Sequence, residues 1–214
     1  MNLIRTTLLF ALILTNQFLF SQDKKDANEI LKQVSEKTKS YSSIKVNFTY
    51  NMDNPGAKVH ESETGTLTVK GDKYRLEISG QTVICDAETS WTYLAESNEV
   101  QINSVESSES VITPTKLLSS YTEDYKAKLS GEVTRNGKAL YVIELKPNQD
   151  KSVTGVELNI DEELLRIMRI AIQDKSGNTF TYIVNKFETN VPVKDSDFSF
   201  NPKDYPGVEV IDMR

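Results

Sequence analysis

The segment from Ile44 to Met52 alternates strictly between apolar and polar side chains. Its apolar members occupy every second position: Ile44, Val46, Phe48, Tyr50 and Met52. Because successive side chains of a strand point to opposite faces, this period of two predicts a β-strand with one apolar and one polar face. The sequence has no phosphate-binding loop, no Gly-x-Ser-x-Gly elbow and no Cys/His zinc spacing. We therefore do not expect an enzyme, and the function must depend on what the apolar face covers.

The first 21 residues have the pattern of a secretory signal peptide. Arg5 precedes an apolar run over residues 8–14, and the small Ser21 precedes a polar stretch that begins with Gln22. The run is shorter than the ~20 apolar residues of a membrane-spanning helix. We place cleavage between Ser21 and Gln22 and expect one exported domain over residues 22–214; a retained N-terminal anchor is the alternative.

Composition and isolated reactive residues exclude several functions. The net charge is −6 with no basic cluster, which argues against nucleic acid as a partner. Cys85 is the only cysteine and follows two apolar residues, so we expect a buried, inert thiol and no disulfide. His60 is expected at the surface. The acids at 161–163 are read as a solvated turn, and neither a metal nor a cofactor is predicted.

Periodicity and turn residues divide the chain into two helices and about ten or eleven strands. Ala27–Tyr41 has helical spacing, with Asp26 as the N-cap and Glu29 completing a capping box. Thr113 and Pro114 begin a short helix in the middle of the chain. The expected strands cover residues 44–52, 60–70, 74–78, 82–85, 91–93, 100–102, 128–135, 138–146, 153–160, 164–173 and 179–187, and residues 207–211 close the chain.

A strongly twisted sheet of this size tends to curl. We therefore predict a mainly β fold, an incompletely closed antiparallel β-barrel or half-barrel. The N-terminal helix and the short mid-chain helix would form a lid over its concave side.

Several short motifs occur in the order found in one known family. Their shared order carries the resemblance: Val46-Asn47-Phe48-Thr49-Tyr50, Gly65-Thr66-Leu67-Thr68-Val69-Lys70, Tyr74-Arg75-Leu76-Glu77, Ser90-Trp91-Thr92-Tyr93, Thr113-Pro114 with Leu117-Leu118, Phe198-Ser199-Phe200-Asn201-Pro202 and Pro206-Gly207-Val208. The chain resembles the LolA family, the periplasmic carriers of outer-membrane lipoproteins, over nearly the whole exported domain.

The resemblance implies a periplasmic chaperone, a monomer that carries acylated lipoproteins from the inner to the outer membrane. Its implied partners are the inner-membrane lipoprotein-releasing ABC transporter and an outer-membrane acceptor. The expected wall of the apolar cavity comprises Phe48, Tyr50, Leu67, Val69, Leu76, Ile78, Trp91 and Tyr93. The expected lid residues are Ile30, Val34, Leu117 and Leu118.

Two alternatives remain open from the sequence. The same apolar residues could pack as a closed, dry core, which periodicity alone does not distinguish from a cavity wall. The fold could also serve as a lipid- or lipoprotein-sensing interaction module without carrier activity. Well-studied family members carry Arg-Pro after the strand that corresponds to residues 65–70, and that arginine gates the cavity. Here Gly71-Asp72 stands there, so no arginine gate transfers, and Arg75 is not a substitute.

Overall fold

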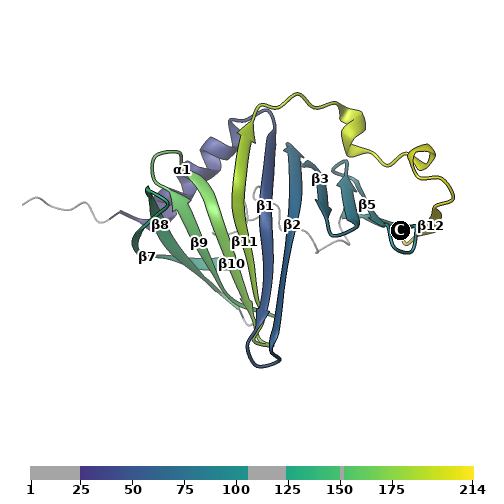
Figure 1. The fold of residues 1–214 in the computed structure, drawn as a ribbon. Coiled ribbons are helices and arrows are strands. Elements are labelled where there is room, and N and C mark those ends of the chain that lie inside the picture. The colour runs from purple at the N-terminus through teal and green to yellow at the C-terminus, as the bar shows by residue number, and fades with distance from the viewer. Residues whose placement is uncertain (1–24, 106–123, 150–151) are drawn as a thin grey trace, which may run out of the picture.

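The structure, a computed structural model, describes residues 25–105, 124–149 and 152–214 (Figure 1). The predicted signal peptide and the predicted short helix with Leu117 and Leu118 lie outside the described residues.

The described chain forms one sheet of twelve strands in the order β12-β6-β5-β4-β3-β2-β1-β11-β10-β9-β8-β7. The strands are β1 (Ile44–Asn54), β2 (Val59–Lys70), β3 (Lys73–Ile78), β4 (Gln81–Cys85), β5 (Thr89–Leu94), β6 (Glu99–Ser104), β7 (Tyr125–Arg135), β8 (Lys138–Pro147), β9 (Val153–Asp161), β10 (Arg166–Asp174), β11 (Thr179–Thr189) and β12 (Glu209–Asp212). The sheet curves without closing (Figure 1), which confirms the predicted incompletely closed barrel. One pairing departs from the prediction, because β12 joins β6 in parallel.

The helix α1 (Ala27–Lys39) covers one face of the sheet, called here the inner face. Asp26 caps it as predicted and accepts a hydrogen bond from the backbone N–H of Asn28 at 3.0 Å. The predicted capping box does not form; Glu29 instead accepts from the Gln33 side chain at 3.1 Å. The helix ends at Lys39, two residues earlier than predicted.

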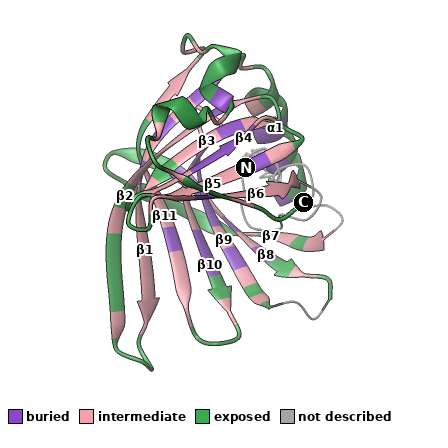
Figure 2. Ribbon diagram, turned by 90° about the vertical axis from the view of Figure 1, so that its right-hand side faces the viewer, coloured by how far each residue is buried: buried purple, intermediate pink, exposed green. Residues whose placement is uncertain are grey.

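The largest apolar core lies between α1 and the strands β8, β9 and β10. Ile30, Leu31 and Val34 of the helix are its upper layer. The strands β8 and β9 supply every second residue, which follows from the alternation of side chains across a strand, whereas a register shift between Ile167 and Arg169 interrupts this spacing on β10. Its buried members are Tyr141, Ile143, Leu145, Val156, Leu158, Ile160, Ile167 and Ile172. Buried positions accordingly recur along these strands and α1 (Figure 2).

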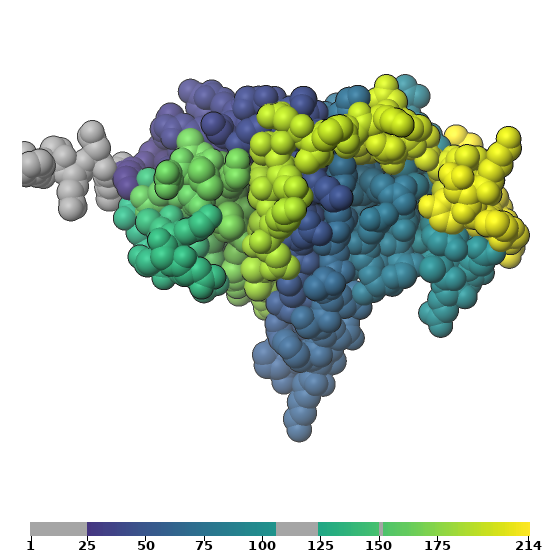
Figure 3. Space-filling view, turned by 45° about the horizontal axis from the view of Figure 1, so that its top comes forward, coloured from purple at the N-terminus to yellow at the C-terminus, as the bar shows by residue number. Residues whose placement is uncertain are grey.

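The segment between β11 and β12 crosses the opposite, outer face of the sheet. It contains two short 3₁₀ helices, η2 (Asp195–Phe198) and η3 (Pro202–Asp204), and the space-filling view shows it lying along the strands of the N-terminal half (Figure 3). Asp195 pairs with Lys70 at 2.9 Å and with Lys73 at 3.5 Å, while Phe198 is fully buried. The chain end therefore forms a second layer on the outer face.

The single residues discussed from sequence lie largely as expected. Cys85 is buried, and burial raises the pKa of its thiol, as expected of an inert cysteine. His60 is exposed, with its Nδ1 atom 2.5 Å from Asp53 Oδ1. Among the described helices, none has the length and apolarity needed to cross a membrane.

Candidate functional site

The inner face continues from the core under α1 across β11 and β1 to β4. Strand register places Phe187, Val46, Leu67, Leu76 and Val83 side by side in one transverse row. All five are apolar, and they come from five adjacent strands. Leu67 and Leu76 are half-buried, whereas Val46 and Val83 are buried. This stripe, called here the apolar row, crosses β11 and β1 to β4 from side to side.

A second row runs beside the first and depends on a glycine. Phe48 of β1 stands opposite Gly65 of β2, which in turn stands opposite Ile78 of β3. A Cβ atom at Gly65 would lie 2.5 Å from Phe48 Cζ and 2.8 Å from the Glu77 carbonyl oxygen. The missing side chain therefore gives the Phe48 ring its place over β2, where Phe48 is only 6% exposed.

Aromatic rings occupy the next part of the inner face, towards the β1–β2 turn. The ring centroid of Tyr50 lies 5.2 Å from that of Tyr182 and 6.5 Å from that of Phe180. Glu61 and Glu63 of β2 share this face, because they pair with Met52 and Tyr50. Burial, followed by these two carboxylates, raises the pKa of Tyr50. The apolar surface thus changes to an acidic one along β2.

In the direction across the strands, the apolar surface ends at β4. Val69 and Tyr74 are buried near Cys85. The next strand places Ser90 and Thr92 on the inner face, opposite Cys85 and Val83. On β5 the inner face therefore carries polar side chains at these positions. The apolar surface stops between β4 and β5.

Six of the eight predicted wall residues come together on this inner face: Phe48, Tyr50, Leu67, Val69, Leu76 and Ile78. The placement of the other two was wrong. Trp91 pairs with Ile84 and Tyr93 pairs with Thr82, so both project from the outer face. There, the ring of Tyr93 packs against that of Tyr205 at 4.4 Å. The register of β5 instead puts Ser90 and Thr92 on the inner face.

The predicted lid residues Ile30 and Val34 lie on the sheet side of α1 and are buried, with exposed fractions of 6% and 0%. Their core partners come from β8, β9 and β10 and not from the wall strands β1–β4. The helix thus covers the C-terminal half of the sheet. Leu117 and Leu118 lie outside the described residues.

The structure also places the residues around the missing arginine. Gly71 takes a positive φ of 59° in the β2–β3 turn, a conformation that glycine adopts without strain. Arg75 projects from the outer face, where its Nε donates to Glu77 at 2.9 Å. Arg75 therefore points away from the inner face and cannot replace the family's arginine there.

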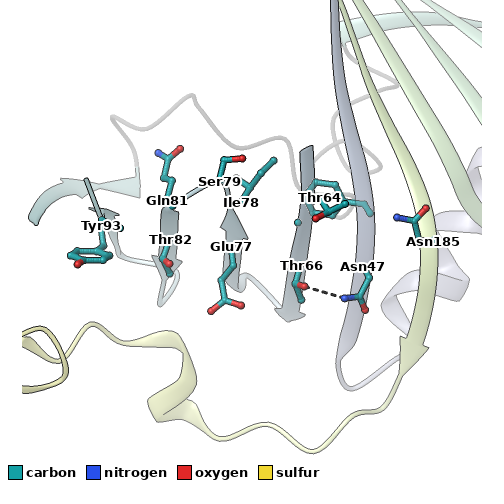
Figure 4. A pocket seen from close by; sticks show the side chains of 14 residues that line it. Asn47, Thr64, Thr66, Glu77, Ile78, Ser79, Gln81, Thr82, Tyr93 and Asn185 are labelled. Carbon is teal, nitrogen blue, oxygen red and sulfur yellow. Dashed lines mark hydrogen bonds between the residues drawn. The ribbon is translucent and has the colours of Figure 1, made fainter. Parts of the chain in front are cut away.

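A shallow hollow of about 560 Å³ lies on the outer face of the same strands. Asn47, Thr66, Glu77, Thr82 and Tyr93 form a transverse row along it (Figure 4). The Asn47 amide donates to the Thr66 hydroxyl at 3.1 Å. The polar character of this row distinguishes the outer face from the inner one and fits a surface in contact with water.

Comparisons with known proteins agree with this fold. An uncharacterized protein of Methanocaldococcus jannaschii is 25% identical over 182 residues, which cover 83% of this chain and 52% of the relative. The chain thus spans about half the length of the curated relative it matches. A solved structure of an uncharacterized conserved protein from Thermus thermophilus superposes with a TM-score of 0.62 at 15% identity, covering 88% of this chain and 99% of that one.

The lipoprotein LppX of Mycobacterium tuberculosis superposes with a TM-score of 0.51 at 14% identity, covering 78% of this chain and 97% of that one. At these identities the two structural likenesses concern the fold. The family profile described as "Outer membrane lipoprotein carrier protein LolA" matches residues 39–201, which is most of the chain. The protein with this half-open sheet and apolar inner face is therefore a member of the LolA family.

Proposed function

We propose that the protein binds the acyl chains of lipoproteins on the inner face of β1–β4 and carries them from the inner to the outer membrane. The family match over residues 39–201 supports a carrier. The inner face is apolar, as a surface that binds hydrocarbon chains must be. Each methylene removed from water contributes about 0.8 kcal/mol, so contact with even part of an acyl chain is favourable.

The observation that carries this proposal is the partial exposure of three residues at the centre of the inner face of β1–β4, whose neighbours Val46, Phe48, Val69 and Val83 are buried. Under α1, Ile143 and Leu158 are fully buried with an exposed fraction of 0%. On β2 and β3, Leu67, Leu76 and Ile78 are only half-buried. In the described residues, the buried apolar side chains of the helix belong to the core that β8, β9 and β10 form. Apolar side chains that keep part of their surface accessible offer contact area to an apolar ligand, which a closed core does not.

The proposed route needs two partners and an exported location. An inner-membrane ABC transporter would load the carrier, and an outer-membrane acceptor would receive its cargo. The protein would act in the periplasm after removal of residues 1–21. The family match supports the two partners, and the sequence pattern of residues 1–21 supports export.

The test is purification of the full chain from the periplasm of a Gram-negative host, followed by mass spectrometry for bound acylated lipoprotein. A companion assay measures release of newly made lipoprotein from spheroplasts. The wild-type protein is expected to co-purify with acylated lipoprotein and to release newly made lipoprotein from the spheroplasts. If it contains none and releases none, the carrier proposal is wrong.

Three variants locate the bound chains. Leu67→Glu places a charge on the half-buried inner face and is expected to leave the protein folded but without cargo. Thr64→Glu makes the same kind of change at an exposed position on the outer face of the same strand and should retain cargo. Leu158→Glu, in the fully buried core, should prevent folding because an unpaired buried charge is very costly. Unfolding by Leu67→Glu would instead show that β2 belongs to a dry core.

A further inference from the structure

Arg166 is the first residue of β10, and its guanidinium contacts two aromatic rings, those of Phe187 and Tyr41. Its guanidinium carbon is 4.7 Å from the ring centroid of Phe187 and 5.8 Å from that of Tyr41. These two rings contact each other edge to face, with centroids 6.4 Å apart. Both rings also pack against the cluster that Ile44, Val46 and Phe48 form on β1. The cation is therefore held by aromatic rings that are continuous with the apolar surface.

Two polar atoms of this cluster are buried without a partner. The Nε atom of Arg166 and the hydroxyl oxygen of Tyr41 are both buried and make no hydrogen bond. No described carboxylate pairs with Arg166. Of the acids in the preceding turn, Asp161 pairs with Lys138 at 3.2 Å and the Oε2 atom of Glu162 pairs with Lys25 at 3.4 Å, while the Oε1 atom of Glu162 is a further buried atom without a partner. Buried polar groups are nearly always satisfied in native proteins, so two unsatisfied groups in one cluster point to a missing partner.

The position of Arg166 relative to the apolar row indicates which chemical groups that partner carries. Phe187, under the guanidinium, is the first member of the row that continues through Val46, Leu67, Leu76 and Val83. At a strand spacing of about 4.8 Å the five strands make a row about 19 Å long. A cation thus stands at one end of an apolar stripe, and a matching ligand has an acidic group at one end of an extended hydrocarbon chain.

We propose that Arg166 binds the anionic headgroup, a carboxylate or a phosphate, of a lipid whose acyl chain lies along the apolar row. A guanidinium that stacks on aromatic faces still has N–H donors in its plane. These can donate two parallel hydrogen bonds to the oxygens of a carboxylate or phosphate. The Tyr41 hydroxyl is placed to donate a further hydrogen bond when the headgroup enters. In a chain of net charge −6, such a site needs a local cation, and Arg166 supplies it.

This inference rests on the proposed acyl-chain surface and extends its ligands from acylated proteins to free anionic lipids. The test uses three radiolabelled probes with the same hydrocarbon chain, namely hexadecanoate, hexadecyl phosphate and hexadecanol, below their aggregation concentrations. Equilibrium dialysis against the full chain gives a dissociation constant for each. Comparison of the two acids distinguishes a carboxylate headgroup from a phosphate, and hexadecanol reports the contribution of the chain alone.

The variants are Arg166→Gln and, as the matched control, Arg169→Gln. The control removes the same charge from the same strand, at a side chain that pairs with Glu157. We expect the wild-type protein to bind at least one acid about tenfold more tightly than hexadecanol, the size of one charge-assisted hydrogen bond. Arg166→Gln should abolish that preference without changing hexadecanol binding, and Arg169→Gln should keep it. The preference should also shrink at high salt.

The outcomes separate this inference from the proposed function. Equal binding of all three probes by the wild type overturns the anion site and leaves the acyl-chain surface in place. A loss that Arg166→Gln causes equally for acids and alcohol also overturns it, because the residue then acts only through the structure of the face. If no probe binds, both the anion site and the acyl-chain surface are wrong.

Discussion

Replacement of Gly65 by alanine tests whether the inner wall is packed as tightly as its interatomic distances indicate. The new Cβ atom would lie 2.5 Å from Phe48 Cζ, 3.0 Å from Phe48 Cε1 and 2.8 Å from the Glu77 carbonyl oxygen. Two of these atoms belong to a buried ring, and the third belongs to the backbone of a neighbouring strand. Neither a ring in a filled site nor a paired strand can move away without loss of other contacts.

The expected loss of unfolding free energy follows from overpacking. Inserting one carbon into a well-packed site costs about 1–3 kcal/mol. For a domain of this size, each kcal/mol lowers the midpoint of thermal unfolding by roughly 2–4 °C. Urea unfolding followed by circular dichroism gives the free energy. Fluorescence of Trp91, the only tryptophan, gives a second signal from the outer face and checks that unfolding is two-state.

Gly155→Ala is the matched control, since Gly155 lies within β9 of the same sheet. There the nearest atoms to the new Cβ are the Leu145 carbonyl oxygen at 3.9 Å and the Gln173 side-chain oxygen at 4.0 Å, which are ordinary contacts. This change should be neutral or should stabilise by about 0.4–1 kcal/mol, because alanine restricts the unfolded chain. Equal effects of Gly65→Ala and Gly155→Ala would refute the packing argument for the inner wall.

A double mutant identifies the clashing partner. Phe48→Leu removes both ring atoms that the new Cβ meets, but it leaves the Glu77 carbonyl in place. The combination of Gly65→Ala with Phe48→Leu should therefore be less destabilising than the sum of the two single changes, by about 1 kcal/mol. Strict additivity would show that the ring is not what excludes a side chain at position 65.

Two further predictions concern single polar groups. Tyr41→Phe removes a buried hydroxyl that has no partner, so the free energy of unfolding in the absence of lipid should stay unchanged or rise by up to about 1 kcal/mol in a urea titration. For Asp161, burial alone would raise the carboxyl pKa, but the Leu164 N–H and the Lys138 ammonium lower it overall. Its stabilising contribution is therefore present above the ordinary pKa of 3.8 and is lost as the pH falls through the lower folded pKa. Asp161→Asn should flatten the acid limb of a plot of melting temperature against pH, and an unchanged acid limb would contradict this.

The strands and their order along the chain could be predicted because each has a local signal. Alternation marks β1, and Asn136-Gly137 marks the β7–β8 hairpin. Both turn residues take the positive φ that such a two-residue turn requires, 52° and 75°. The α1 cap at Asp26 is local as well. Signals of this kind depend on a few neighbouring residues, so they can be recognised in the sequence without knowledge of the fold.

The face of the sheet on which each side chain lies could not be predicted equally well. It depends on the pairing register with strands that are distant in the sequence. β5 has no clean alternation: Ser90, Thr92 and Leu94 are its inner residues, and Trp91 and Tyr93 its outer ones. An aromatic pair in such a strand indicates burial without saying on which side. The outer layer that packs against Tyr93 comes from residues after β11, and the ring of Tyr205 lies more than one hundred positions along the chain from Tyr93.

The same outer layer is tied to the turn between β2 and β3. The resemblance described above expects a gating arginine in this turn, whereas here Gly71-Asp72 forms it between Lys70 and Lys73. Both lysines pair with Asp195 on the outer face, so this turn is linked to the C-terminal segment. Because these contacts are exposed, each adds little stability. Arg166 lies over Phe187, at the β11 end of the apolar row. In the complex proposed above, the headgroup is therefore met at the start of β10, whereas the lysines that flank the β2–β3 turn pair with Asp195 on the outer face.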